Sequence, residues 1–364
     1  MKNKEIGKRV SQLLMMGIAS LRLTQEEKFF IKKHQIGGII LFSRNYSDPE
    51  QLVDLINDIN SLYKETPPFL AVDQEGGSVI RFKKPFTQFP GNDYLGRYYE
   101  RTESLDLVRE YAEVTAKELR AFGVNVCLSP VADILTNPEN KVIGKRAFSK
   151  DPLVVSAIAK TIIEEFRKNG IIACAKHFPG HGDTTEDSHE ELPVVNHNLD
   201  FLRDRELAPF RAVIETTVPM IMTSHILYKE IDPKYPVTLS KTLITDLLRN
   251  EMWHNNLVIS DDFEMQGLSK NYDLDEAAVL ALNAGVDIVL VCHCLGKVEK
   301  VYERLIREIG ERPDFSERIG ESFERVLKIK NDFSLSLSKI NYKKAMGAFD
   351  YDRSSKLIKL IEGY

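Results

Sequence analysis

Eight short apolar runs recur along this chain of 364 residues, and amphipathic stretches of helical spacing separate them. Strands that alternate with helices favour a parallel sheet, and eight such units favour a closed (β/α)8 barrel of the TIM type. We therefore predict a single α/β domain built on this barrel. The predicted strands are Leu13–Ile18, Gly37–Phe42, Phe69–Asp73, Val124–Leu128, Ile171–Lys176, Met220–Ser224, Leu257–Asp261 and Asp287–Cys292.

Three of the predicted helices have clear boundaries in the sequence. Asp151 stands at an N-cap position, Pro152 at the first helical position, and Gly170 where a helix would be closed by glycine. A second helix should end at Gly123, and a third should occupy residues 273–285. Their apolar residues recur at helical spacing, which indicates packing against the barrel.

The last 33 residues differ from the rest of the chain. No low-complexity segment or linker divides the sequence before about Asn331, so we assign residues 1–331 to the barrel. Residues 332–364 are first basic and serine-rich and then helical in pattern at Ser354–Ile361. We predict a C-terminal appendage, because so short a segment rarely buries a core of its own.

Composition narrows the possible partners and the compartment. The net charge of −5 gives no support to a nucleic-acid partner, which would require a basic face. The apolar run at residues 13–19 is short for a signal peptide, and no run reaches the length that spans a membrane. Four cysteines lie in or beside apolar runs, as free thiols do in a reducing compartment, so we expect a cytoplasmic protein. These cysteines are Cys127, Cys174, Cys292 and Cys294.

Titratable residues follow several of the predicted strands. In a barrel enzyme the functional groups gather where strands end and the following loops begin. The residues that stand at these ends are Asp73, Lys176, His177, His225 and Asp261. Carboxylates, imidazoles and a lysine therefore converge on one rim, which predicts an active site there.

The segment from Cys174 to Val195 carries three of the eight histidines of the chain. Glycines and prolines interrupt this segment, so most of it is predicted to be a loop. Within it, Asp187 could accept a hydrogen bond from one imidazole nitrogen of His189 and leave the other nitrogen to transfer a proton. The alternative is a solvated loop in which the two residues are neighbours by chance.

Asp261 ends a strongly apolar strand. A carboxylate at this end of a barrel strand is well placed for nucleophilic attack, and the alternative is a structural carboxylate paired with a neighbouring cation. A divalent-metal site is a further alternative, with His177, His181, Asp183, Asp187 and His189 as its candidate ligands. We disfavour it because Pro179 and Gly180 interrupt any shared helix face, and no metal or cofactor is expected.

Five sequence motifs then point to a known family. They are IGGIILFSRN at 36–45, LAVDQEGG at 70–77, IGKRAF at 143–148, KHFPGHGDTTEDSH at 176–189 and VISDDFEM at 258–265. In this order the motifs resemble glycoside hydrolase family 3, specifically its β-N-acetylglucosaminidase branch. The chain is similar to the single-domain bacterial enzymes of that branch, which act on muropeptides in cell-wall recycling.

The resemblance implies a fold, a reaction and roles for individual residues. The fold would be the barrel predicted above, and the reaction a retaining hydrolysis of terminal β-linked N-acetylglucosamine from a small or oligosaccharide substrate. Asp261 would be the nucleophile, and His189, oriented by Asp187, the acid/base. The residues that would hold the sugar hydroxyls are Asp73, Arg81, Arg146, Lys176 and His177.

One position departs from the family pattern, and two other functions stay open. Ser78 stands where family members commonly place arginine. A histidine acid/base would not repel phosphate as a carboxylate does, so the chain could also be a β-N-acetylglucosaminide phosphorylase. A sugar-binding barrel without catalysis is the non-enzymatic alternative.

Overall fold

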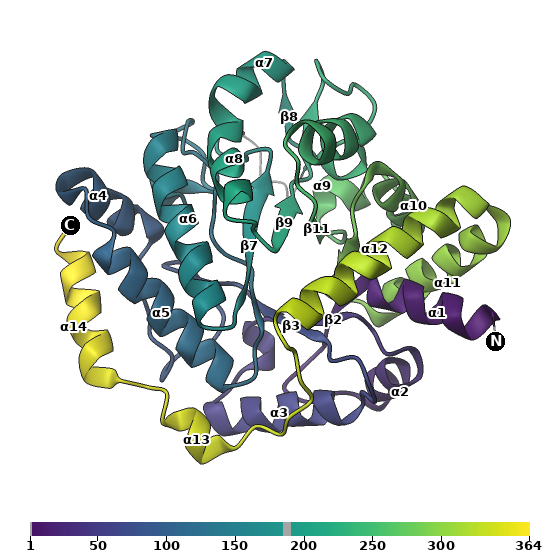
Figure 1. The fold of residues 1–364 in the computed structure, drawn as a ribbon, viewed down its shortest axis with the longest axis horizontal. Coiled ribbons are helices and arrows are strands. Elements are labelled where there is room, and N and C mark those ends of the chain that lie inside the picture. The colour runs from purple at the N-terminus through teal and green to yellow at the C-terminus, as the bar shows by residue number, and fades with distance from the viewer. Residues whose placement is uncertain (1, 185–190) are drawn as a thin grey trace.

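A computed structural model describes residues 2–184 and 191–364, and its centre is a closed barrel of eight parallel strands (Figure 1). Each predicted apolar run supplies one strand, so the predicted (β/α)8 barrel is confirmed. Around the barrel the strands follow the order β1-β12-β11-β9-β7-β6-β3-β2. They comprise β1 (Leu14–Gly17), β2 (Gly38–Leu41), β3 (Phe69–Val72), β6 (Val126–Cys127), β7 (Ile172–Phe178), β9 (Met220–Thr223), β11 (Leu257–Asp262) and β12 (Ile288–Val291).

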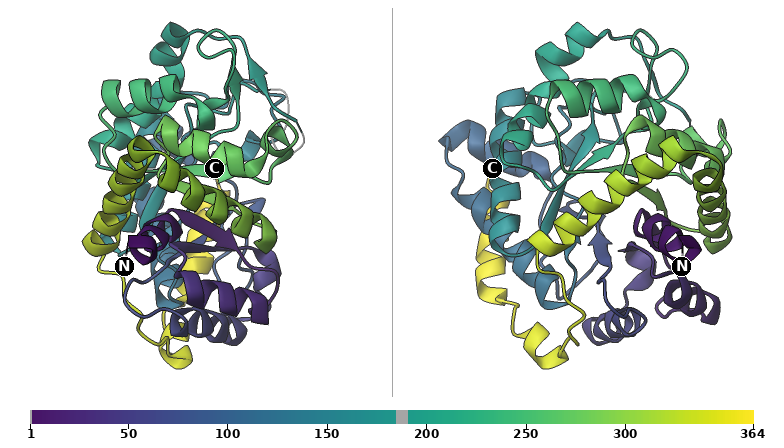
Figure 2. Two further views of the ribbon diagram at one scale, coloured as in Figure 1. Left: turned by 90° about the vertical axis from the view of Figure 1, so that its right-hand side faces the viewer. Right: turned by 45° about the vertical axis from the view of Figure 1, so that its right-hand side comes forward.

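Helices cover the outside of the barrel, as two further views show (Figure 2). The α-helices are α1 (Lys2–Gln12), α2 (Gln25–His34), α3 (Pro49–Ser61), α4 (Asn92–Thr102), α5 (Asp106–Ala121), α6 (Pro152–Lys168), α7 (Leu199–Phe201), α8 (Leu207–Glu215), α9 (Gln266–Ser269), α10 (Leu274–Ala284), α11 (Leu295–Glu311), α12 (Pro313–Asp332), α13 (Tyr342–Met346) and α14 (Tyr351–Glu362). Three elements are 3-10 helices, η1 (Ser43–Asn45), η2 (Gly144–Arg146) and η4 (Val237–Leu239), and two are π-helices, η3 (Leu202–Glu206) and η5 (Thr242–Glu251). Two pairs of short strands lie outside the barrel, β4 (Gln74–Gly76) with β5 (Val79–Ile80) and β8 (Val194–Val195) with β10 (Leu227–Tyr228).

The predicted helix boundaries agree with the structure. The Asp151 side chain accepts a hydrogen bond of 2.8 Å from the Leu153 N–H and so caps the first turn of α6. Gly170 follows this helix with a φ of 74°, a left-handed conformation that glycine adopts without strain. Gly285 closes α10 in the same way, with a φ of 117°.

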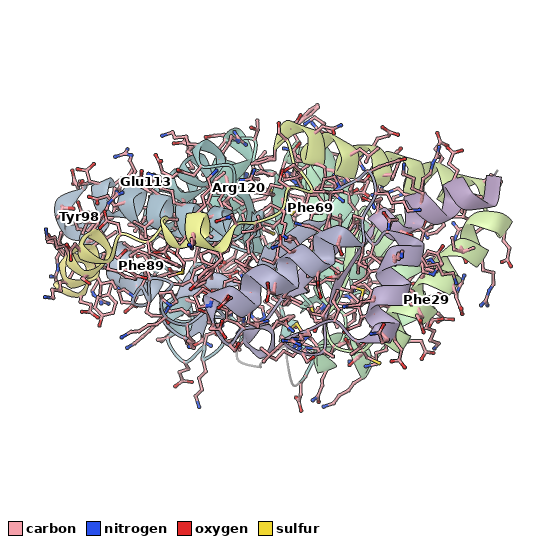
Figure 3. The ribbon with its side chains drawn as sticks, turned by 90° about the horizontal axis from the view of Figure 1, so that it is seen from below. Phe29, Phe69, Phe89, Tyr98, Glu113 and Arg120 are labelled. Atoms are coloured by element: carbon pink, nitrogen blue, oxygen red, sulfur yellow. The ribbon has the colours of Figure 1, made fainter. Side chains whose placement is uncertain are left out.

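The core lies inside the barrel and between the barrel and its helices. All seven residues of β7 are buried, because a parallel barrel strand is covered on both faces. Phe69 of β3 is fully buried, whereas Phe29 of α2 lies on the outside with 66% of its surface exposed (Figure 3). The apolar runs of the sequence therefore form the barrel strands, and the packing of their buried side chains fixes where the strands end.

The C-terminal residues after α12 lie along the outside of the barrel. Helix α13 packs against α3 and α5, and helix α14 packs against α4 and α5 (Figure 1). Leu357 and Ile361 of α14 are buried in this contact, and Asn57 exchanges two hydrogen bonds with the backbone of Ile340. The helix predicted at Ser354–Ile361 is present and is longer at both ends.

Two further observations concern the described residues as a whole. None of their helices has the length and apolar character needed to cross a membrane. All four cysteines are free thiols; three of them are buried and Cys294 is exposed.

Candidate active site

A cavity of about 410 Å³ opens where the barrel strands end. Its walls come from the carboxyl ends of the barrel strands, among them β3, β7, β11 and β12, and from the loops that follow strands, including the loop after β6 that carries Arg146. The polar residues that line it are Asp73, Glu75, Arg81, Arg146, Lys176, His177, His181, Asp261, Asp262 and His293. The structure therefore brings together all six predicted site residues that it describes.

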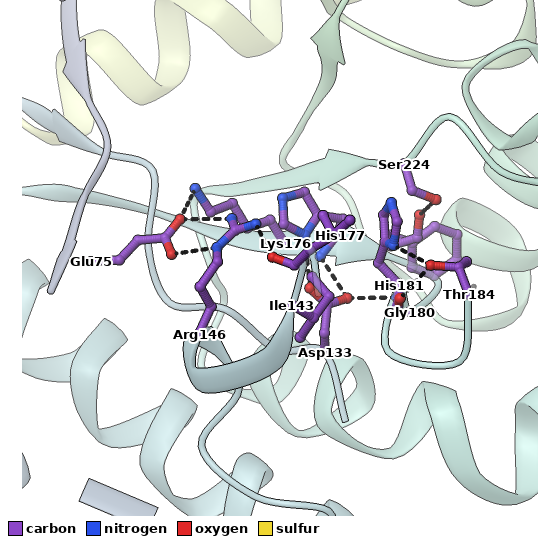
Figure 4. Close-up of polar contacts among 12 residues, drawn as sticks. Glu75, Asp133, Ile143, Arg146, Lys176, His177, Gly180, His181, Thr184 and Ser224 are labelled. Atoms are coloured by element: carbon purple, nitrogen blue, oxygen red, sulfur yellow. Dashed lines mark hydrogen bonds and ion pairs between the residues drawn. The ribbon is translucent and has the colours of Figure 1, made fainter. Parts of the chain in front are cut away.

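A network of ion pairs occupies one side of this cavity. The Lys176 Nζ lies 2.7 Å from Asp73 Oδ1 and 2.6 Å from Glu75 Oε1. The guanidinium of Arg146 donates hydrogen bonds to both carboxylate oxygens of Glu75, at 2.9 Å each (Figure 4). Arg81 donates to Asp73 over 3.3 Å. Each cation is held in a fixed position by a carboxylate before any substrate arrives.

The charges of this network stay ionised although it is buried. Burial alone would raise the pKa of Asp73 and of Glu75, but the neighbouring cations outweigh it and hold both pKa values below their usual range. Burial would likewise lower the pKa of Lys176, and the two carboxylates raise it instead. The cavity therefore presents charged hydrogen-bonding groups, which are stronger partners than neutral ones.

A second group is built on His177, the next residue along β7. The buried carboxylate of Asp133 lies 2.7 Å from His177 Nδ1 and accepts hydrogen bonds from the backbone N–H groups of His177 and His181 (Figure 4). This contact places a proton on Nδ1 of His177 and orients its ring. Burial, with His177 nearby, lowers the pKa of His181 to about 4, so His181 is neutral near pH 7.

Asp261 lies on the cavity wall at the end of β11. Its Oδ1 accepts a hydrogen bond of 2.8 Å from the Asp262 N–H. The Asp262 side chain accepts from the backbone of Cys292 over 3.2 Å, which joins the end of β11 to the end of β12. His225 is buried behind them and lies 3.1 Å from the Asp262 carbonyl oxygen. The end of β11, which carries the Asp261 carboxylate, is thus joined to β12 through Asp262.

The predicted Asp187–His189 dyad lies outside the described residues. Among the described residues on either side of it in the sequence, Asp183 lies 2.5 Å from His197 Nε2, and the Thr184 hydroxyl is 2.9 Å from His181 Nδ1. Within residues 2–184 and 191–364, no three His, Cys, Asp or Glu side chains form a group that could hold a metal ion.

Glu75 and Asp133 are among the site residues that the sequence prediction did not name. Glu75 belongs to the short strand β4, two residues beyond the predicted Asp73, and a strand of three residues gave no periodic signal. Asp133 follows β6 after an irregular stretch that contains Pro130. The sequence signal available for both was their place just after a predicted strand.

Ser78, which departs from the family pattern, is exposed in the turn between β4 and β5.

A barrel whose rim cavity combines a strand-end carboxylate with fixed cations, carboxylates and imidazoles defines an enzyme that handles polyhydroxylated substrates. The chain belongs to glycosyl hydrolase family 3, whose N terminal domain matches residues 5–329. It is a glycosidase and is related to β-hexosaminidases.

Individual relatives support the family assignment along most of the chain. The chain is 39% identical to the β-hexosaminidase of Nitrosomonas eutropha over 282 residues, 77% of this chain and 80% of that protein. It is 38% identical to the β-hexosaminidase of Bordetella avium over 296 residues, 80% of this chain and 83% of that protein.

Solved structures of the same family have the same fold. A family 3 β-N-acetylglucosaminidase from Paenibacillus sp. str. FPU-7 superposes with a TM-score of 0.90 at 34% identity, over 98% of this chain and 68% of that one. NagZ from Neisseria gonorrhoeae, in complex with N-trifluoroacetyl-D-glucosamine, superposes with a TM-score of 0.78 at 29% identity, over 96% of this chain and 97% of that one.

Proposed function

We propose that this chain is a retaining exo-β-N-acetylglucosaminidase that removes terminal β-linked N-acetylglucosamine. The observation that carries the proposal is the position of Asp261, which shares one cavity with a pre-formed set of charged hydrogen-bonding groups. Such groups suit a neutral sugar, whose hydroxyls both donate and accept hydrogen bonds.

The proposed sugar-binding residues are Asp73, Arg81, Arg146, Lys176 and His177. The lysine and the two arginines donate, the aspartate accepts, and all of them face the same cavity. Because ion pairs already hold these side chains, little conformational freedom is lost when a sugar binds. That property favours tight positioning of the anomeric carbon against the nucleophile.

The proposed reaction has two steps. In the first, an Asp261 oxygen attacks the anomeric carbon, the glycosidic bond breaks, and His189 donates its proton to the departing oxygen. In the second, His189 takes a proton from water, whose oxygen displaces Asp261 from the same carbon. Asp187 would keep the His189 ring in position. The roles of Asp187 and His189 rest on the motif at 176–189.

We further propose muropeptides in cell-wall recycling as the substrates and the cytoplasm as the compartment. The support for this context is the resemblance to single-domain bacterial enzymes of the family, and the free cysteines are consistent with a reducing compartment.

The first test compares an aryl β-N-acetylglucosaminide with the matching β-glucoside, with phosphate and EDTA varied. We expect release from the N-acetyl substrate alone, with no effect of either additive. A rate that depends on phosphate would make the enzyme a phosphorylase, and loss of the rate in EDTA would require a metal. Absence of turnover on both sugars would refute the proposed activity.

Variants of the two catalytic groups test the mechanism. Asp261→Asn should abolish turnover while the fold is retained, and near-normal activity would refute the nucleophile assignment. His189→Ala should harm substrates with poor leaving groups far more than activated aryl glycosides, which need little protonation. Equal losses on both would count against an acid role.

A further inference from the structure

A second cavity, of about 540 Å³, opens at the opposite end of the barrel from the site described above. Its walls include Pro219 and Asn256, which directly precede β9 and β11, so it lies where these strands begin. Leu257 and Asp261 are four residues apart on β11, or about 13 Å at the usual rise of a strand. The two cavities are therefore separated by the length of the barrel.

The rim of this second cavity carries Trp253, the single tryptophan of the chain. Its exposed fraction is 75%, although tryptophan is a residue that most proteins bury in large part. Its φ is 62°, in the left-handed region just after η5. Glycine normally takes such a position, and Gly170 does so after α6 on the same rim. A side chain here costs roughly 1 kcal/mol or more.

The backbone around Trp253 is held firmly on both sides. The Met252 N–H donates to the Leu247 carbonyl over 2.9 Å, and the His254 N–H donates to the Leu248 carbonyl over 3.1 Å. The buried His254 ring adds a contact of 3.0 Å to the Leu257 carbonyl. An exposed indole on so rigid a support loses little freedom when a ligand stacks on it.

Polar side chains make up much of the cavity wall beside the indole, and Ile214, Ile329 and Phe333 add apolar surface to it. Arg167 donates to the Thr216 and Thr217 carbonyl oxygens at 2.8 and 2.5 Å, which fixes its planar guanidinium at the rim. Asn256 donates to the Thr217 and Val218 carbonyl oxygens, and the exposed Asn255 lies beside it. The ion pair of Lys328 and Asp332, 3.0 Å long, borders the same cavity.

An exposed aromatic face, with apolar residues and amide, guanidinium and carboxylate groups in the same cavity, matches the surface of a saccharide. A sugar ring has an apolar face of C–H groups that packs on an aromatic ring, and its hydroxyls project sideways to polar partners. We propose that the cavity beside Trp253 is a second saccharide-binding site, which holds a glycan chain on the face of the barrel opposite the active site.

The choice of β-linked N-acetylglucosamine chains as the ligand rests on the proposed function. The test therefore uses chitotetraose as the probe and the Asp261→Asn protein, which should not hydrolyse it. Because Trp253 is the only tryptophan, its fluorescence reports on this cavity alone. We expect chitotetraose to shift the emission to shorter wavelengths and saturate with a dissociation constant of roughly 1 mM.

Trp253→Gly is the matching variant, because glycine relieves the backbone strain and the fold should be retained. In the Asp261→Asn protein, calorimetry should show two chitotetraose binding events, one at each cavity. Adding Trp253→Gly should reduce the affinity of the weaker event at least tenfold. Trp253→Gly alone should hydrolyse an aryl β-N-acetylglucosaminide within twofold of the unaltered enzyme. Phe29→Ala, which removes another exposed aromatic residue, should change neither measurement.

Three outcomes would overturn the inference. They are an emission spectrum that chitotetraose leaves unchanged, a weaker binding event that persists in the Trp253→Gly protein, and an emission shift that follows protein concentration instead of saccharide. The last would identify a contact between copies of the chain. Failure of the unaltered enzyme to hydrolyse the aryl glycoside would count against the proposed function and not against this site.

Discussion

Replacement of Glu75 by glutamine tests whether the ion pairs of the active site act as one unit. The Glu75 side chain is 1% exposed, and its two oxygens accept three hydrogen bonds from Lys176 and Arg146. Glutamine has nearly the same shape, so the change removes the charge and replaces one acceptor by a donor that faces Arg146. Of the two carboxylates in the network, only Asp73 would then remain to balance Lys176, Arg146 and Arg81.

The expected loss follows from this geometry. Breaking a buried ion pair by removing one partner costs about 3–5 kcal/mol, because the other charge stays buried without compensation. We expect that loss in the free energy of unfolding of Glu75→Gln. In activity, weakening the hold on Lys176 and Arg146 by about 1.5–3 kcal/mol should lower kcat/KM roughly 10- to 150-fold.

Urea unfolding at pH 7 measures the stability term, and the same change at an exposed pair is the control. Glu5→Gln breaks the pair with Arg9, whose partners are 67% and 39% exposed, and should cost less than about 1 kcal/mol. The pKa of Glu75 is lower in the folded protein than in the unfolded chain. Its contribution to the free energy of unfolding is therefore fully present above the pKa of the unfolded chain and is lost as the pH falls toward the pKa of the folded protein. A loss in Glu75→Gln no larger than that in Glu5→Gln would refute the reasoning.

Three further changes probe other parts of the molecule. Asp133→Asn should lower kcat/KM about 10- to 100-fold in steady-state kinetics, because an amide N–H facing Nδ1 of His177 forces the proton onto the other nitrogen. Burial raises the pKa of Glu118 from 4.5 to about 7, so the free energy of unfolding should fall as the pH rises between these values. Urea unfolding at pH 5 and pH 8 measures this fall, and Glu118→Gln should make it smaller by up to about 3 kcal/mol. Gly182→Ala would place its Cβ 1.6 Å from a backbone carbonyl oxygen and should lower both the melting temperature and kcat, whereas Gly310→Ala, in open space on α11, should not.

The barrel could be predicted from the sequence because its strands are buried on both faces. Such strands appear as continuous apolar runs, and the runs at 171–176 and 257–261 became β7 and β11 with ends shifted by one or two residues. The run at 124–128 yielded only the two-residue strand β6. Its neighbours form hydrogen bonds to the barrel without regular pairing, which depends on tertiary contacts that no local pattern carries.

The site was predictable only where it coincides with strand ends. Asp73, Lys176 and Asp261 stand there, and their convergence follows from the topology alone. Arg81 and Arg146 were predicted through the family resemblance. Both lie outside the barrel strands. The carboxylate that holds Arg146 is 71 residues away in the sequence, and the one that holds Arg81 is 8 residues away, across the β4–β5 turn. The Asp187–His189 dyad lies outside the described residues and stays a prediction.

The two ends of the barrel use the same chemistry for different purposes. At the start of β12, the buried Asp287 forms ion pairs with three arginines, and these pairs link η5 and α12 to the strand. The arginines are Arg249, Arg318 and Arg325. Several cations there converge on one carboxylate, so their hydrogen-bonding capacity is directed inward and contributes to the fold.

At the opposite end, Asp73 and Glu75 hold their cations at the wall of a cavity large enough for a sugar. A buried ion pair adds little to stability compared with apolar residues of the same volume, so stability alone does not account for charges at this place. Cations fixed by carboxylates can donate to hydroxyls without reorganising, and in the proposed reaction this rigidity would let binding energy position the substrate for attack by Asp261. We therefore propose that the network at the strand ends serves to bind substrate, and that the stability it contributes is a consequence of its rigidity.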